Sequence, residues 1–180
     1  MRVGGVIGAV MLLAMAPRAV AAPSGSMTFE GFYLQPLGAL SREYSGGAGG
    51  YGGVALFFPD RYEMAIKAGY VSYLAAADLP ADRSLSALHL MVGPRYYFLT
   101  STLRPYAALN VGLNLVFEST AAGRNHLTAE LAWQILLGVA LHVAGPVGID
   151  VAAKYNAHFF EQDRMMTGFE YGLALRVETF

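Results

Sequence analysis

The side chains in this chain that are best suited to binding a metal ion are histidines and carboxylates. The sequence holds four histidines and no cysteine, which excludes a thiolate metal site, a cysteine nucleophile and a disulfide framework. His89, His126, His158 and Glu118 are the candidate ligands, because a zinc-type site needs two or three such groups to converge. Histidines that are simply hydrogen-bonded are more common. We therefore predict neither a metal site nor a cofactor.

Acyl hydrolysis or transfer would need a serine or a comparable nucleophile beside a histidine. The nearest candidate set is Asn156, His158 and Glu161, and no serine accompanies it in that segment. A nucleophile and its base must be placed together before activity is claimed. We therefore predict that the protein is not an enzyme and has no catalytic residues.

A glycine-rich segment, Gly47-Ala48-Gly49-Gly50-Tyr51-Gly52, matches the dinucleotide-binding pattern G-x-G-x-x-G by letter. That pattern requires a helix after the glycines, whereas the apolar run 54–58 predicts a strand. We interpret the glycines as a flexible loop, with residues 41–50 forming a connection.

Charged and polar residues recur at every second position through much of the chain. In 62–74, for example, Glu63 and Lys67 lie on one face and bulky apolar residues on the other. Successive strand side chains point to opposite faces, so each strand has one apolar and one mixed face. Only Glu30 cannot be assigned to a face. We expect a polar network on the mixed face formed by Glu63, Lys67, Arg95, Arg104, Glu130, Asp150, Lys154, Glu170 and Arg176, with Glu118 and Glu178.

Eight such segments follow one another, with connections that alternate in length. The expected strands are 28–40, 51–58, 62–74, 87–99, 103–118, 127–142, 147–160 and 167–179. The connections near 59–61, 100–102 and 145–146 are short, and those at 41–50, 75–86, 119–126 and 161–166 are longer. This pattern predicts an all-β fold, an eight-stranded antiparallel up-and-down transmembrane β-barrel with its longer loops outside.

The distribution of small residues decides which face is inside. Gly and Ala share the mixed face with the charges, and an eight-stranded lumen has little room for large side chains. A soluble barrel has the opposite arrangement, with its apolar face inward. A further alternative is a transmembrane helix over 131–149, which carries no formal charge. Gly145-Pro146 interrupts that run, so we favour two strands.

The composition and the first residues indicate an exported membrane protein. The chain is 55% hydrophobic and 14% charged, which is more apolar than an ordinary soluble domain. Residues 1–21 have the basic start, short apolar run and Ala-Val-Ala ending of a signal peptide, leaving 22–180 as the barrel. Without Arg2 and Arg18 the net charge is about −3, which argues against nucleic acid as a partner.

The segment Val92-Gly93-Pro94-Arg95-Tyr96-Tyr97-Phe98, followed by Arg104-Pro105-Tyr106, resembles the small outer-membrane barrels related to the OmpA transmembrane domain and to OmpX. The terminal stretch Phe169–Phe180 resembles the assembly signal of that family. The resemblance implies contact with outer-membrane lipid and lipopolysaccharide, and with the barrel-assembly machinery through the last strand. Phe180 departs from the family pattern because it shares the parity of Glu178, and a bulge or frayed end near Thr179 is our hypothesis for this.

The family includes passive anchors, adhesins, narrow pores and lipid A-modifying enzymes, so the resemblance predicts fold more than function. Six acidic and five basic side chains would face the lumen, and such a balanced set is typical of an internal salt-bridge network. We predict a monomeric structural or surface-exposed barrel with a packed polar lumen in the bacterial outer membrane. The alternatives are a narrow passive pore, an adhesin and a lipid A-modifying enzyme.

Overall fold

The computed structural model describes residues 24–58, 61–77, 84–119, 125–160 and 164–179, and of residues 125, 159, 160, 164 and 165 it describes only the backbone. The predicted signal peptide over 1–21 lies outside the described residues, as do Glu161 and Phe180.

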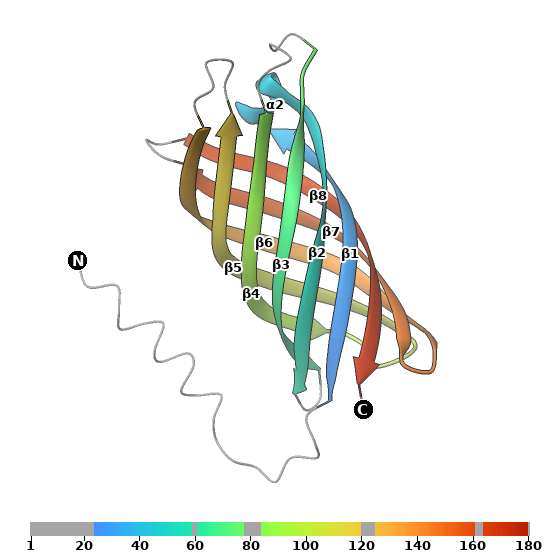
Figure 1. The fold of residues 1–180 in the computed structure, drawn as a ribbon. Coiled ribbons are helices and arrows are strands. Elements are labelled where there is room, and N and C mark those ends of the chain that lie inside the picture. The colour runs from blue at the N-terminus through green and yellow to red at the C-terminus, as the bar shows by residue number, and fades with distance from the viewer. Residues whose placement is uncertain (1–23, 59–60, 78–83, 120–124, 161–163, 180) are drawn as a thin grey trace, which may run out of the picture.

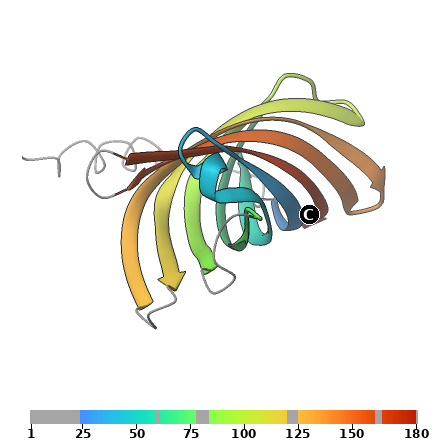
Figure 2. The ribbon, with the colours of Figure 1, turned by 90° about the horizontal axis from the view of Figure 1, so that it is seen from above.

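Eight antiparallel strands form a closed barrel in which each strand pairs with its neighbours in sequence and β8 closes onto β1 (Figure 1). The strands run steeply tilted around the barrel axis, as the view from above also shows (Figure 2). Their bounds are β1 Gly25–Leu37, β2 Tyr44–Phe58, β3 Tyr62–Ala75, β4 Ser84–Tyr97, β5 Leu103–Ser119, β6 Asn125–Ala144, β7 Val147–Phe160 and β8 Arg164–Thr179. The predicted fold class is confirmed.

The two ends of the barrel differ. One end, the turn end, carries the beginning of β1, the end of β8 and the short β2–β3, β4–β5 and β6–β7 connections. Gly145 lies in the tight β6–β7 turn with φ of 53°, a left-handed conformation that glycine adopts without strain. The other end, the loop end, carries the one-turn helix α2, Leu40–Glu43, the end of β3 and the beginning of β4 (Figure 1).

The prediction of a loop over residues 41–50 is wrong. Residues 40–43 form α2, and β2 begins at Tyr44, so the glycine-rich segment is a paired strand. Gly49 lies opposite Phe32 of β1 and Val71 of β3. A Cβ at Gly49 would overlap the Phe32 ring and the β3 backbone. These glycines are therefore required for close packing inside the barrel, whereas the sequence pattern was interpreted as flexibility.

The predicted alternation of faces is present in every strand. Bulky apolar residues such as Ile66, Leu113 and Leu173 are exposed on the outer wall, and the mixed face lines the interior. Glu30, which the sequence left unassigned, also points inward and pairs with Lys154. Apart from connections and strand ends, the described charged side chains therefore all face the lumen.

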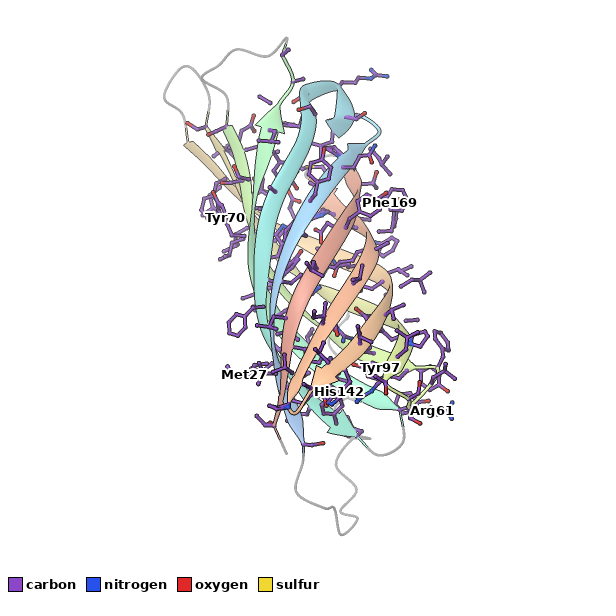
Figure 3. The ribbon with its side chains drawn as sticks, turned by 90° about the vertical axis from the view of Figure 1, so that its right-hand side faces the viewer. Met27, Arg61, Tyr70, Tyr97, His142 and Phe169 are labelled. Atoms are coloured by element: carbon purple, nitrogen blue, oxygen red, sulfur yellow. The ribbon has the colours of Figure 1, made fainter. Side chains whose placement is uncertain are left out.

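Aromatic residues gather on the outer wall near both ends. Tyr96 contacts both Tyr62 and Phe98 near the turn end. Tyr155 and Phe169 are in contact nearer the loop end, where Tyr70 also lies (Figure 3). Aromatic residues near both ends of the wall are typical of the interfacial girdles of membrane barrels.

The alternative of a helix over 131–149 is wrong, because this segment forms most of β6, a turn and the start of β7. No helix within the described ranges is long and apolar enough to cross a membrane. The β1–β8 pairing continues in regular register to Thr179. No bulge is present in β8 up to Thr179, and the alternative of a frayed end stays a hypothesis because Phe180 lies outside the described residues.

Candidate functional site

The lumen near the turn end contains an ion-pair network, here called the arginine cluster, formed by Glu63, Arg95, Arg104, Asp150, Arg176 and Glu178. Arg176 Nη2 lies 2.6 Å from Glu63 Oε2, and Arg95 Nη1 lies 2.8 Å from Asp150 Oδ2. Arg104 Nη1 lies 3.3 Å from Glu178 Oε1. Three arginines thus face three carboxylates, and each ion finds an opposite charge.

Two tyrosines hold this cluster in place. The hydroxyl of Tyr97 donates to Glu63 Oε2 at 2.7 Å and accepts from Arg95 and Arg176. The Arg95 guanidinium lies 4.1 Å from the centre of the Tyr106 ring, within the range of a cation–π contact. Buried charges are tolerated when they are paired and hydrogen-bonded in this way.

The middle of the lumen contains a second network, the lysine cluster, formed by Glu30, Lys67, Lys154 and Glu170. Lys154 pairs with Glu30 and with Glu170, whose Oε2 lies 3.3 Å from Lys154 Nζ. Lys67 Nζ donates to Gln134 Oε1 at 2.6 Å, and the side-chain amide of Gln134 donates to Glu170 at 3.2 Å. Two lysines therefore balance two carboxylates across four strands.

The loop-end part of the lumen is apolar, a feature that the sequence analysis did not predict. We call this group the loop-end cap, and it consists of Phe32, Leu34, Tyr44, Val71, Tyr73, Leu85, Ala87 and Val116, all of them buried. Leu40 of α2 packs against it. The alternation of the two faces was visible in the sequence. The apolar character of the inner face at this end was not, because glycines and serines lie among these residues in the sequence.

Large lumen side chains are placed over glycines of neighbouring strands. A Cβ at Gly69 would overlap the Tyr51 ring, and a Cβ at Gly138 would approach the Tyr106 hydroxyl to within 2.6 Å. Each glycine thus leaves room for a ring that the narrow lumen could not otherwise hold. The small residues of the mixed face are therefore packing positions for particular partners.

The interior has little free space. A cavity of about 30 Å³ lies between the two clusters, beside Lys67, Arg95 and Asn110. This is room for on the order of one or two water molecules. A wider opening of about 340 Å³ lies at the turn end, beside Arg104 and Glu178.

The structure brings most of the predicted polar residues together. Eight of the nine lie in the two clusters, and Glu130 joins neither. Glu118 lies opposite His126 at the loop end, and His126 Nδ1 is 3.1 Å from Thr128 Oγ1. His158 contacts Asn114, and Asn156 accepts a hydrogen bond from Gln134. Glu161, the third member of that candidate set, lies outside the described residues.

Several lumen residues that organise the networks were not predicted. Tyr51, Tyr97 and Gln134 each bridge two or more charged or polar groups, and Asn110 and Asn114 add amide contacts. Their inward parity was readable from the sequence. Their partners were not, because those lie on strands far apart in the chain.

No protein-family model matches the chain, and no curated protein matches its sequence. Solved structures do match its fold. Neisserial surface protein A superposes with a TM-score of 0.67 at 16% identity, over 85% of this chain and 96% of that protein. OprG of Pseudomonas aeruginosa gives 0.61 at 12% identity, over 88% and 96%. Ail, the attachment invasion locus protein of Yersinia pestis, gives 0.60 at 11%, over 88% and 100%.

These matches are outer-membrane proteins, and this chain has both their barrel and an apolar, girdled outer wall. The chain has the fold of the small eight-stranded outer-membrane β-barrels. The resemblance stated from the sequence is confirmed at the level of fold. The outer membrane enzyme PagL shares this fold with a TM-score of 0.51 at 11% identity, over 83% of this chain and 98% of PagL. The fold therefore does not assign an activity.

Proposed function

We propose that this protein is a closed structural barrel of the outer membrane that conducts no solutes. The observation that carries the proposal is the filled lumen, whose central cavity measures only about 30 Å³. The lysine cluster and the apolar loop-end cap lie on the loop-end side of this cavity, and the arginine cluster lies on its turn-end side. A hydrated ion would have to displace a buried ion-pair network and then cross an apolar layer, and both steps are costly.

The wall and the ends supply the remaining surfaces for partners. The apolar wall contacts outer-membrane lipid and lipopolysaccharide, and the last strand, β8, is recognised by the barrel-assembly machinery. Residues 1–21 are removed as a signal peptide, the turn end faces the periplasm, and the barrel is a monomer. These are proposals that rest on the sequence patterns and the fold.

Single-channel recording in planar bilayers tests the closed lumen. We expect no reproducible conductance steps from the refolded barrel, with a sixteen-stranded porin as the positive control because its lumen is an aqueous channel. Steps whose size changes in Lys67→Ala would instead establish the narrow pore, since Lys67 lines the central cavity.

One observation favours a second candidate function, acyl hydrolysis at the loop-end rim. A pocket of about 200 Å³ there is lined by Ser84, Ser86, Ser119, Glu118 and His126. The ring of His126 bonds to Thr128, however, and not to one of these serines. We expect the acyl masses of lipid A to be the same with and without the gene. A loss of one acyl chain that depends on His126 would establish the enzyme instead.

A further inference from the structure

Among the residues that the structure describes, the buried carboxylate of Glu130 has no counter-ion. The arginine cluster pairs three acids with three bases, and the lysine cluster pairs two with two. Glu130 belongs to neither cluster, although only 3% of it is exposed. Within the part of the chain that the structure describes, nothing donates a hydrogen bond to either of its carboxylate oxygens. An isolated buried carboxylate is strongly unfavourable.

Two more buried polar side chains lie beside Glu130 on the neighbouring strands β4 and β5. His89 of β4 lies opposite Asn114 of β5, and Asn114 lies opposite Glu130 of β6. All three point into the lumen, and His89 and Asn114 are 2% and 0% exposed. Adjacent strands lie 4.7–4.9 Å apart, so the backbones of His89 and Glu130 are about 10 Å apart. The three side chains thus enter the lumen from adjacent positions on three neighbouring strands.

The hydrogen bonds of His89 direct its free lone pair. Tyr51 has one hydroxyl proton, which it donates to Glu170 Oε1 at 3.2 Å. The Tyr51 oxygen must therefore accept from Nδ1–H of His89, which lies 3.2 Å away. This leaves the lone pair on Nε2, which is buried and has no partner among the described residues. Metal-binding histidines are commonly oriented by such a bond from the other ring nitrogen.

Asn114 is oriented in the same way. Its side-chain nitrogen donates to Nδ1 of His158, so its carbonyl oxygen Oδ1 is the atom left over. That oxygen is buried and also lacks a donor within the described ranges. The row thus offers an imidazole nitrogen, an amide oxygen and a carboxylate, all of them electron-pair donors and none of them supplied with a proton.

We propose that His89, Asn114 and Glu130 form a binding site for a divalent first-row transition metal ion such as Zn²⁺. Such an ion accepts all of these lone pairs and neutralises Glu130. Mixed nitrogen and oxygen ligands suit this class, whereas Mg²⁺ prefers oxygen ligands alone. No group of three His, Cys, Asp or Glu side chains is close enough to hold a metal in the described parts of the chain. The third protein ligand is accordingly an amide, and water completes the coordination.

This inference departs from the sequence prediction of no metal site. The sequence candidates were His89, His126, His158 and Glu118. His89 and His158 are buried in the lumen, whereas His126 and Glu118 lie at the loop end. Of these candidates only His89 belongs to the proposed site. His158 instead contacts Asn114, and Glu130 is an additional ligand. Asn114 was not a candidate because an amide alone is not a metal signature.

The test uses untagged protein refolded in detergent, so that no added histidines bind metal. Equilibrium dialysis against Zn²⁺ followed by elemental analysis should find about one zinc ion per chain. We expect Glu130→Gln and His89→Gln each to weaken binding at least about tenfold, and His126→Gln, a matched exposed histidine at the same end, to leave it unchanged. Mg²⁺ at the same concentration should not compete.

Substitution with Co²⁺ gives a second readout, because its visible absorption reports ligand type. The spectrum of bound Co²⁺ should change in His89→Gln if Nε2 is a ligand. Gel mobility of heated and unheated samples shows which variants are folded. Folded wild-type protein that binds no zinc, or zinc binding that is lost in His126→Gln and kept in Glu130→Gln, would overturn the proposal.

Discussion

Arg176 is the residue on which the arginine cluster depends most. It is 1% exposed, pairs with Glu63 Oε2 at 2.6 Å and also donates to Tyr97. Its side chain joins carboxylates from β3 and β7 to β8. A buried ion pair is not by itself a large stabilising contribution, but removing one partner leaves the other charge buried and unpaired.

We therefore expect Arg176→Met to lower the free energy of unfolding by about 3–5 kcal/mol. Denaturant titration of the barrel in lipid vesicles measures this. Arg42→Met, at an exposed position of α2, serves as the control and should change stability by no more than about 0.5 kcal/mol. Combining Arg176→Met with Glu63→Gln should recover part of the loss, since the pair is coupled. Strictly additive effects would contradict the network.

At the level of the strands, glycines determine how the sheet curves around its contents. Gly138 of β6 faces inward beneath Tyr106 of β5, whereas Gly31 of β1 faces outward with nothing within 4 Å of an added Cβ. Both are extended glycines in strand interiors, so they differ in packing and not in backbone conformation. This pair separates the two roles of glycine in the barrel.

We expect Gly138→Ala to lower the free energy of unfolding by about 1–3 kcal/mol, because the new methyl group overpacks the lumen. Gly31→Ala should be neutral or stabilising by up to about 1 kcal/mol, because alanine restricts the unfolded chain. The yield of refolded, heat-modifiable protein and its unfolding midpoint measure both variants. Equal destabilisation at the two sites would show that Tyr106 does not occupy this space.

The whole molecule is inverted relative to a soluble protein, with its ions inside and its bulky apolar side chains outside. The strands have 13 to 20 residues, more than the roughly 9–11 that cross a bilayer. In a bilayer their ends would therefore extend beyond the hydrocarbon layer, with the aromatic residues of the outer wall at its two borders. Depth along a strand should then control the cost of a charge on the outer wall.

Val111 lies at the middle of β5 and Leu103 at its turn end, and both are exposed on the wall. We expect Val111→Arg to cost about 2–4 kcal/mol of unfolding free energy in vesicles, and Leu103→Arg about 0–1 kcal/mol. Comparing unfolding in vesicles with unfolding in detergent measures the effect of depth. If the two arginines cost the same amount, this wall does not face a bilayer.

The sequence by itself determined the barrel and its two faces, because the two-residue period of a strand is a local property. It placed Glu63, Arg95 and Arg176 on the same face without any knowledge of their partners. It misassigned residues 41–50, because a glycine in a turn and a glycine beneath an aromatic ring have the same local signature. It also left Glu30 unplaced.

Only the tertiary structure decided which inward residues meet. Glu63 and Arg176 are 113 residues apart in the chain, and their pairing depends on the closure of the barrel and on the register between strands. The same closure separates the lumen into a cap and two balanced clusters, and leaves Glu130 beside Asn114 without a counter-ion. Such contacts arise from strand-to-strand alignment, which no period within a single strand encodes.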